Sequence, residues 1–225
     1  MFDFSSVPLI LASASPRRRE LLHYIKEEYQ VETSGAEASV HLPPDTPAEE
    51  IPMLLARAKA LDISRKHPEK VVIGADTVVI SPSGEILGKP RDAADAKAML
   101  RALSGATHRV VTGVCLCRYT PASAADQSEA AASGTSGPER APSAVAEDSA
   151  LQIRLFNEVT KVTFYPLSDD EIDAYVDTGE PMDKAGAYGI QGYGSLLAEK
   201  IQGDFFNVVG LPVSKLAREL AAFVK

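Results

Sequence analysis

The chain has 225 residues, of which 45% are hydrophobic and 24% are charged, a composition typical of a globular protein large enough to bury a core. Its formal net charge of −8 argues against a protein that binds nucleic acid over a general basic surface. We find no signal peptide and no apolar run long enough to span a membrane, so we expect a cytoplasmic protein without membrane contact.

The first motif is a strand followed by a helix whose start carries three arginines. Residues 7–12 are apolar and predict a strand, and helical spacing follows over residues 16–27. Pro16 suits the first helical position, and Ser15 suits the N-cap. Because free backbone N–H groups, the helix dipole and the arginines at 17–19 converge, the turn predicts a phosphate site. The alternative is a solvated basic first turn.

The next segment predicts a strand, a helix and a second, stronger strand. Residues 29–33 alternate as a short strand, and residues 46–49 match a capping box with proline at the first helical position. Pro52 falls inside the helical pattern that follows, so this helix is either kinked or begins later. Residues 71–80 are almost continuously apolar, which predicts a strand buried on both faces.

The second half of the chain predicts more strands than helices. Residues 121–150 are mostly Ala and Ser with scattered Gly and Pro, which predicts a flexible insertion between two strands of one hairpin. We expect further strands over residues 85–87, 108–119, 151–167, 196–201 and 205–209, and further helices over 92–103, 168–179 and 212–224. This order predicts an α/β protein with a mixed sheet flanked by helices, rather than a strictly doubly wound fold.

Asp76 is unusual because it is a carboxylate within an apolar strand. Its burial costs free energy unless it is paired or metal-bound, which marks it as a functional candidate. The alternative is that the strand ends before Asp76. Lys59 and Lys89 each lie beside apolar structure, and each alone is typical of a surface lysine. Together with the arginine turn they fit a triphosphate site, in which Glu37 and Asp76 would hold a divalent cation.

Six motifs in order along the chain resemble the Maf family of nucleotide pyrophosphatases. They are SASPRRRELL (13–22), GADT (74–77), GKPR (88–91), LSG (103–105), DKAGAYGIQG (183–192) and GDFFNVVGLP (203–212). The resemblance implies one Maf-like domain over residues 1–225 with an inosine-triphosphatase-like fold: an elongated mixed sheet, two lobes and a central cleft. It also implies a homodimer. It covers residue 9 to the C-terminus, except for the 121–150 insertion.

The resemblance implies a reaction and a set of site residues. The reaction is hydrolysis of nucleoside triphosphates at the α–β phosphoanhydride, assisted by Mg²⁺ or Mn²⁺. Asp76 matches the proton acceptor for the attacking water, and it would share the metal with Glu37. The residues expected to hold the phosphates are Ser13, Arg17, Arg18, Lys59 and Lys89. The residues expected to select dTTP and UTP are Arg17, Thr77 and Gln191.

Two questions stay open from the sequence. A glutamine amide can present either end to a base, so Gln191 discriminates only if a neighbour such as Arg17 or Thr77 fixes its orientation. The alternative is a surface glutamine in a glycine-rich hairpin. The function also has alternatives: a non-enzymatic cell-division regulator or single-stranded nucleic-acid binder, and a phosphatase that removes only the terminal phosphate.

Overall fold

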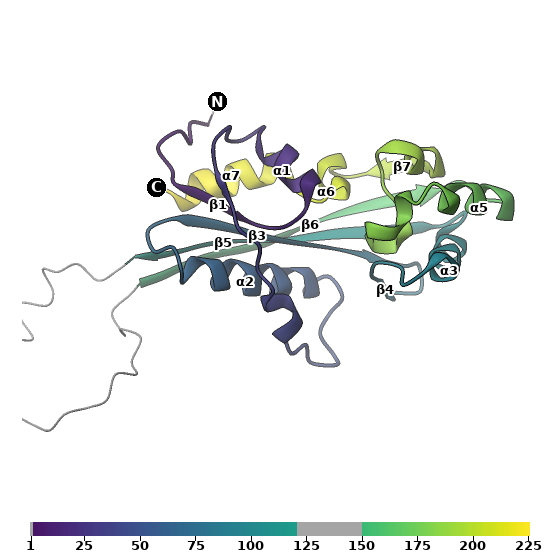
Figure 1. Ribbon diagram of the computed structural model, residues 1–225, viewed down its shortest axis with the longest axis horizontal. Coiled ribbons are helices and arrows are strands. Elements are labelled where there is room, and N and C mark those ends of the chain that lie inside the picture. Colours follow the sequence, from purple (N-terminus) through teal and green to yellow (C-terminus); the bar gives the residue numbers. More distant parts are fainter. Residues whose placement is uncertain (1, 121–149) are drawn as a thin grey trace, which may run out of the picture.

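The computed structural model describes residues 2–120 and 150–225, arranged around a seven-stranded mixed sheet (Figure 1). The sheet order is β2-β1-β3-β5-β6-β7, and β4 pairs with β3. The strands are β1 (Leu9–Ala12), β2 (Gln30–Val31), β3 (Val71–Ile80), β4 (Ile86–Leu87), β5 (Thr107–Thr120), β6 (Ala150–Phe164) and β7 (Ala198–Gln202). The mixed α/β class predicted from the sequence is confirmed.

The helices lie on both sides of this sheet. The α-helices are α1 (Pro16–Leu22), α2 (Ile51–Ser64), α3 (Ala93–Leu103), α5 (Asp169–Asp177), α6 (Phe205–Val209) and α7 (Val213–Phe223). Short 3₁₀ turns are η1 (Ala36–Ser39), η2 (Glu180–Asp183), η3 (Ala185–Ala187) and η4 (Gly192–Leu197). Within the described residues, no helix combines the length and apolar character needed to cross a bilayer.

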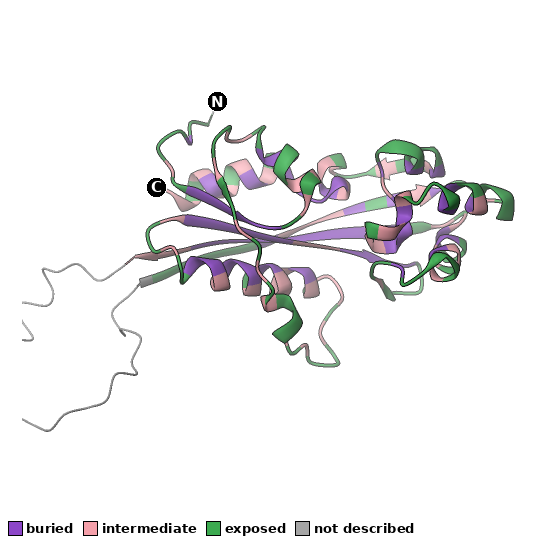
Figure 2. Ribbon diagram, in the orientation of Figure 1, coloured by how far each residue is buried: buried purple, intermediate pink, exposed green. Residues whose placement is uncertain are grey.

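Three long strands, β3, β5 and β6, run through the whole molecule and join its two ends (Figure 1). At one end α2 covers one face of the sheet, and α1 and α7 cover the other. At the opposite end α3, α5 and β7 gather around the same strands. Many residues of these strands are buried where helices cover the sheet (Figure 2). The molecule is therefore elongated, with two groups of elements on one continuous sheet.

The strand β3 has the bounds predicted from the sequence and is buried along its length except at Asp76 and Thr77. Asp76 pairs with Gly113 of β5, so it lies inside the strand, and the alternative that the strand ends before it is wrong. Because side chains alternate along a strand, Asp76 and Thr77 point to opposite faces of the sheet. Both faces at this position therefore contribute to one opening.

That opening results from a change of neighbour along the edge of β3. The parallel strand β1 stops where Ala12 pairs with Gly74, and the antiparallel strand β4 begins where Leu87 pairs with Val79. Between these points the edge of β3 has no strand beside it among the described residues. In open α/β sheets, ligands commonly bind beyond the end of a strand, at the point where the order of the strands in the sheet reverses. The topology thus exposes Asp76 and Thr77 at such a point.

Several local predictions were wrong at helix boundaries. The first helix ends at Leu22 rather than at residue 27. The capping box at residues 46–49 does not start a helix, because the Thr46 hydroxyl donates to Pro43 O. The helix α2 begins at Ile51, with Pro52 in its first turn. Of the two predicted alternatives, a kinked helix or a helix that begins later, the second is therefore the one observed. The predicted insertion at 121–150 lies outside the described residues except for Ala150, the first residue of β6.

The segment 205–209, predicted as a strand, is the helix α6. Its Phe and Val residues favour strands, but its flanking residues favour a helix. The Asp204 carboxylate accepts from Phe206 N at 2.8 Å and caps the helix. Gly210 ends it with a φ of 128°, in the region that favours glycine. Local capping has therefore outweighed residue propensity.

Candidate active site

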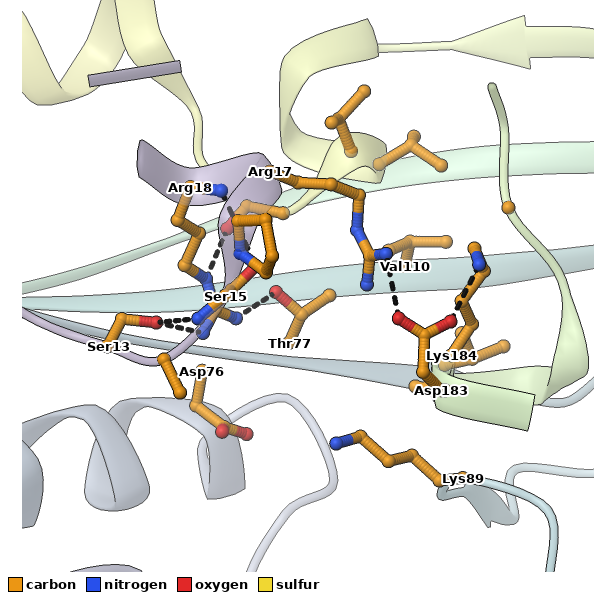
Figure 3. A pocket seen from close by; sticks show the side chains of 18 of the residues that line it. Ser13, Ser15, Arg17, Arg18, Asp76, Thr77, Lys89, Val110, Asp183 and Lys184 are labelled. Carbon is orange, nitrogen blue, oxygen red and sulfur yellow. Dashed lines mark hydrogen bonds and ion pairs between the residues drawn. The ribbon is translucent and has the colours of Figure 1, made fainter. Parts of the chain in front are cut away.

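The opening beside β3 is a cavity of about 400 Å³ (Figure 3). The turn between β1 and α1 lines one side, and β3 and α2 line another. The segment that follows β4, residues between 183 and 191, and the end of α6 complete it. All the residues that the sequence assigned to binding or catalysis line this cavity: Ser13, Arg17, Arg18, Glu37, Lys59, Asp76, Thr77, Lys89 and Gln191. The structure therefore brings together residues from six separate segments.

The start of α1 has the predicted cap. Ser15 is the N-cap, its side chain accepts from Arg18 N, and Pro16 occupies the first helical position. The helix has seven residues, so the arginine side chains supply most of the positive charge at this turn. This arrangement directs Arg17 and Arg18 to different partners.

Arg18 turns back onto the sheet. Its guanidinium donates to Gly210 O at 2.8 Å, to Thr77 Oγ1 at 2.9 Å and to Ser13 Oγ at 3.3 Å (Figure 3). Burial lowers the pKa of Arg18, against the opposing charge of Asp76, and the group stays cationic. Arg18 thus ties α1 to β3 and to the end of α6, and places a fixed charge at the cavity wall.

Lys59 lies between two carboxylates. Its ammonium donates to Asp76 Oδ1 at 2.7 Å and forms an ion pair with Glu37. The side chains of Lys59 and Asp76 are only 11% and 16% exposed, whereas that of Glu37 is 50% exposed. The buried lysine offsets the cost of placing Asp76 in an apolar strand.

Two glycines bring α2 close enough to the sheet for this contact. A Cβ atom on Gly74 would overlap the carbonyl oxygen of Ala56, and one on Gly113 would overlap the backbone of Pro52 and Met53. Both glycines therefore allow the backbone of α2 to lie directly on β3 and β5. Gly113 is also the residue opposite Asp76, so the close approach occurs at the candidate catalytic position.

Arg17 reaches across the cavity to the other group of elements. Its guanidinium donates to Asp183 Oδ2 at 3.1 Å, and Lys184 donates to Asp183 Oδ1 at 2.7 Å (Figure 3). Burial alone raises the pKa of Asp183, but hydrogen bonds from Lys184 and Arg17 outweigh burial and hold the pKa below its usual value. Asp183 is thus ionised at neutral pH.

Lys89 enters the cavity from the segment after β4 (Figure 3). The preceding residue, Gly88, accepts a backbone hydrogen bond from Gly186 N at 3.0 Å, which attaches this segment to the η3 turn. Lys89 therefore lies on the same side of the cavity as Asp183 and faces the opening across from Arg18.

Gln191 is exposed and lies at the rim of the cavity. The sequence left open whether Arg17 or Thr77 fixes its amide. In the described part of the chain neither does: Arg17 donates to Asp183, and Thr77 Oγ1 is bonded to Arg18 and Thr112. The two neighbours suggested by the sequence therefore do not fix the orientation of the Gln191 amide.

The donor set beside Lys59 suits a hard divalent cation. Glu37 and Asp76 both reach the same ammonium, so their carboxylates are close enough to share one cation. No cluster of three or more His, Cys, Asp or Glu side chains with metal-binding geometry occurs in residues 2–120 and 150–225. Mg²⁺ commonly takes only one or two protein carboxylates and completes its shell with phosphate and water, so the pair fits.

Sequence reasoning missed several residues that support the site. Asn207 is fully buried, and its amide donates to Val110 O at 3.1 Å and to Thr160 Oγ1 at 3.0 Å. The backbone carbonyl oxygen of Asn207 accepts a hydrogen bond from the Thr112 hydroxyl, which is also hydrogen-bonded to Thr77 Oγ1. An asparagine inside the apolar run 205–209 was the available signal, because a buried amide needs partners. For Gly113 the signal was a glycine inside a strand.

Comparison with known proteins gives one consistent result. The family described as Maf-like protein matches residues 8–223. A dTTP/UTP pyrophosphatase of Bacillus cytotoxicus is 43% identical over 214 residues, covering 95% of this chain and 94% of the relative. One of Carboxydothermus hydrogenoformans is 42% identical over 219 residues, covering 94% and 96%.

A solved structure of the Staphylococcus aureus Ham1 protein aligns with a TM-score of 0.37 and 14% identity, over 83% of this chain and 77% of that chain. The family match and the alignments with the curated relatives cover nearly the whole chain, and the family match includes every residue that lines the cavity. The chain therefore belongs to the Maf family.

Proposed function

We propose that this chain is a nucleoside triphosphate pyrophosphatase that hydrolyses dTTP and UTP to the monophosphate and pyrophosphate. The observation that carries the proposal is one cavity that combines five cationic side chains with three carboxylates: Arg17, Arg18, Lys59, Lys89, Lys184, Glu37, Asp76 and Asp183. The names of the relatives, dTTP/UTP pyrophosphatase, support the same substrate class.

The cationic side chains suit a triphosphate. Arg17 and Lys89 face the cavity from opposite sides, and Arg18 fixes a third charge at its wall (Figure 3). Charges held in place before the reaction stabilise the negative charge that develops on a departing pyrophosphate, with little reorganisation. The cluster would thus bind the β- and γ-phosphates and favour cleavage at the α–β bond.

Asp76 is the proposed proton acceptor for the attacking water. Lys59 bonds to Asp76 Oδ1, which orients the carboxylate and leaves Oδ2 as the oxygen that can take the proton. Glu37 and Asp76 would hold Mg²⁺ or Mn²⁺, which when bound lowers the pKa of coordinated water and neutralises phosphate charge. Water then adds to the α-phosphorus, the bond to the bridging oxygen breaks, and pyrophosphate leaves with that oxygen.

Gln191 is the proposed base-selecting residue, together with Arg17 and Thr77, which line the same cavity. A glutamine amide can accept from N3–H of uracil or thymine and donate to an adjacent carbonyl. The methyl group of thymine changes selectivity by only about 1–3 kcal/mol, so dTTP and UTP should both be good substrates. CTP and purine nucleotides should be poor ones.

A panel of nucleoside triphosphates with Mg²⁺ or Mn²⁺ tests the proposal when products are read directly. We expect dTMP or UMP together with pyrophosphate. Release of orthophosphate would instead indicate a phosphatase acting on the terminal phosphate. Absence of turnover would favour a non-enzymatic regulator or nucleic-acid binder. Turnover of ATP or GTP at a rate comparable with that of dTTP would contradict the selectivity.

The substitution Asp76→Asn tests the role of the carboxylate. Removing a general base typically costs about 10²–10⁴-fold in turnover, and we expect a loss in this range with folding retained. Steady-state rates at saturating Mg²⁺, together with an unfolding curve, check it. A variant that keeps near-normal turnover would show that Asp76 is not the proton acceptor.

We also propose that the protein acts in the cytoplasm as a homodimer, as its family resemblance implies. The chain has a mass of 24.0 kDa. Light scattering on the purified protein should therefore give about twice this mass, and a mass equal to one chain would contradict the dimer.

A further inference from the structure

The glycine-rich segment 189–194 forms a closed loop that carries Gln191. A Cβ atom on Gly194 would overlap Gly189 O and lie 2.6 Å from the Tyr175 hydroxyl, so the two ends of the loop are in contact. Gly192 has a φ of 64°, where a side chain would be strained. Gln191 lies between these points, so the position of the loop determines where its amide lies at the cavity.

The carboxylate of Glu180 holds both ends of this loop. Glu180 Oε2 accepts from Tyr193 N at 2.9 Å, and Oε1 accepts from Gly194 N at 3.1 Å. The Tyr175 hydroxyl donates to Glu180 Oε1 at 3.0 Å and accepts from Gly189 N at 3.1 Å. One carboxylate therefore fixes the far end of the loop directly and the near end through Tyr175.

All three partners of this carboxylate are donors. Burial raises the pKa of Tyr175, and the charge of Glu180 acts in the same direction, so the phenol keeps the proton that it donates. An ionised carboxylate accepts through both oxygens, whereas a glutamine would turn an NH₂ group against at least one donor. The site thus requires a carboxylate and not merely a polar side chain of the same shape.

We propose that Glu180 is a positioning residue for base selectivity, which holds the loop 189–194 so that Gln191 meets the base of the bound nucleotide. The proposal rests on the proposed function for its substrate class. Glu180 itself is not among the residues that line the cavity. It therefore acts through Gln191 and not by contact with the nucleotide.

Binding of non-hydrolysable α,β-methylene analogues of UTP and CTP, measured by calorimetry with Mg²⁺, tests this role. In Glu180→Gln we expect affinity for the UTP analogue to fall roughly 10- to 100-fold, a factor that corresponds to the loss of a hydrogen bond to a charged group. Affinity for the CTP analogue should change less than about threefold, because the phosphate-binding side chains are untouched. The preference for UTP would then collapse.

Glu171→Gln is the matched control. Glu171 also accepts a backbone hydrogen bond, from Ser168 N at 2.7 Å, but it lies in the capping box of α5 and not at the loop. It should keep the wild-type preference. Tyr175→Phe removes the hydroxyl that joins Gly189 N to Glu180 Oε1 and leaves the hydrogen bonds from Tyr193 N and Gly194 N in place, so it should shift the preference in the same direction by a smaller factor.

The outcomes separate this proposal from the proposed function. A Glu180→Gln protein that keeps the wild-type preference, or that loses affinity for both analogues equally, would overturn the positioning role. A wild-type protein without preference would overturn it as well. Hydrolysis of dTTP and UTP is measured in parallel on the wild type. Absence of turnover with a retained binding preference would reject the hydrolase, and the binding data on the variants would still decide the role of Glu180.

Discussion

At the residue scale, Arg18 combines a charge at the cavity with a structural role. Its three guanidinium nitrogens donate to Gly210 O, Thr77 Oγ1 and Ser13 Oγ, which belong to three different segments. A guanidinium offers donors in a fixed planar fork, whereas a lysine ammonium is a compact point charge. Charge alone therefore cannot replace this side chain.

The substitution Arg18→Lys should destabilise the protein by about 2–3 kcal/mol, since buried acceptors on separate segments lose their partner. Chemical denaturation measures this loss. Arg19→Lys is the control, because Arg19 is exposed on the same helix, and it should change the unfolding free energy by less than about 0.5 kcal/mol. Equal stability of the two variants would show that Arg18 contributes only charge.

A second residue, His108, makes stability depend on pH. Its ring lies edge-on to Phe164 and Tyr188, and its Nε2 is 2.7 Å from the Tyr188 hydroxyl. Burial lowers the pKa of His108 from 6.5 to about 4. The unfolded chain therefore binds this proton at a higher pH than the folded chain does. Stability contributed by the neutral ring is complete above pH 6.5 and is lost as the pH falls toward 4.

The expected loss is up to about 3 kcal/mol across this range, since one pKa unit corresponds to about 1.4 kcal/mol. Urea unfolding at several pH values measures it. Because carboxylates also titrate, the comparison is with His108→Gln, which should show a shallower pH dependence than the wild type. His41→Gln replaces an exposed histidine and should follow the wild type. Parallel curves for all three proteins would contradict the assignment.

At the element scale, the approach of α2 to the sheet positions Lys59 against Asp76, the proposed proton acceptor. Gly74 and Gly113 leave no room for a side chain beneath α2, and Lys59 reaches Asp76 from this helix. Overpacking of such a contact typically costs about 1–3 kcal/mol and moves the backbone. The helix is thus held at one distance from β3, and that distance sets the site.

The substitution Gly74→Ala should therefore lower both stability and turnover. We expect a loss of about 1–3 kcal/mol in unfolding free energy, as for other overpacked contacts. Turnover should fall by as much as about 100-fold, because displacement of α2 misplaces Lys59 against Asp76. Gly88→Ala is the stability control, since a Cβ there meets nothing within 4 Å. A Gly74→Ala protein with normal stability would show that α2 can shift freely.

The strand β3 and the helix α6 differ in how well the sequence could predict them. The bounds of β3 and the N-cap Ser15 depend on local residues, and they were predicted correctly. The segment 205–209 was predicted wrongly, because its apolar residues fit a strand and only its flanking caps favour a helix. Local signals therefore describe elements well where propensity and capping agree.

The site required more than local signals. Asp76 could be singled out because a carboxylate in an apolar strand is costly anywhere. Glu180, in contrast, has no such signal in the sequence. The three groups that donate to its carboxylate are the backbone N–H groups of residues 193 and 194 and the Tyr175 hydroxyl. Partners of this kind are fixed only when the loop closes. Motif residues could thus be predicted, while the residues that position them could not.

At the scale of the whole molecule, one ion pair links the two ends of the sheet across the cavity. Arg17 belongs to α1 and Asp183 to η2, and their side chains are 32% and 62% exposed. A pair this exposed contributes at most about 1 kcal/mol. The elements at the two ends are therefore held in place by the continuous strands β3, β5 and β6 and not by this pair.

We expect Asp183 also to compete with an anionic ligand for Arg17, because it accepts a hydrogen bond from this guanidinium. Lys184 and Arg17 hold the pKa of Asp183 below its usual value, so its negative charge is present at neutral pH. In Asp183→Asn we expect KM for dTTP to fall about two- to fivefold, because Arg17 becomes available to the phosphates, while unfolding free energy changes by less than about 1 kcal/mol.

Kinetics at low and high salt complete this test. The decrease in KM caused by Asp183→Asn should be smaller at high ionic strength, because salt screens exposed charges. Asp169→Asn removes a carboxylate of the same charge from the exposed Arg101–Asp169 pair on α5, and it should leave KM unchanged. If KM rises in Asp183→Asn, then Asp183 does not compete with the nucleotide but orients Arg17 toward it, and the pair belongs to the substrate-bound state as well.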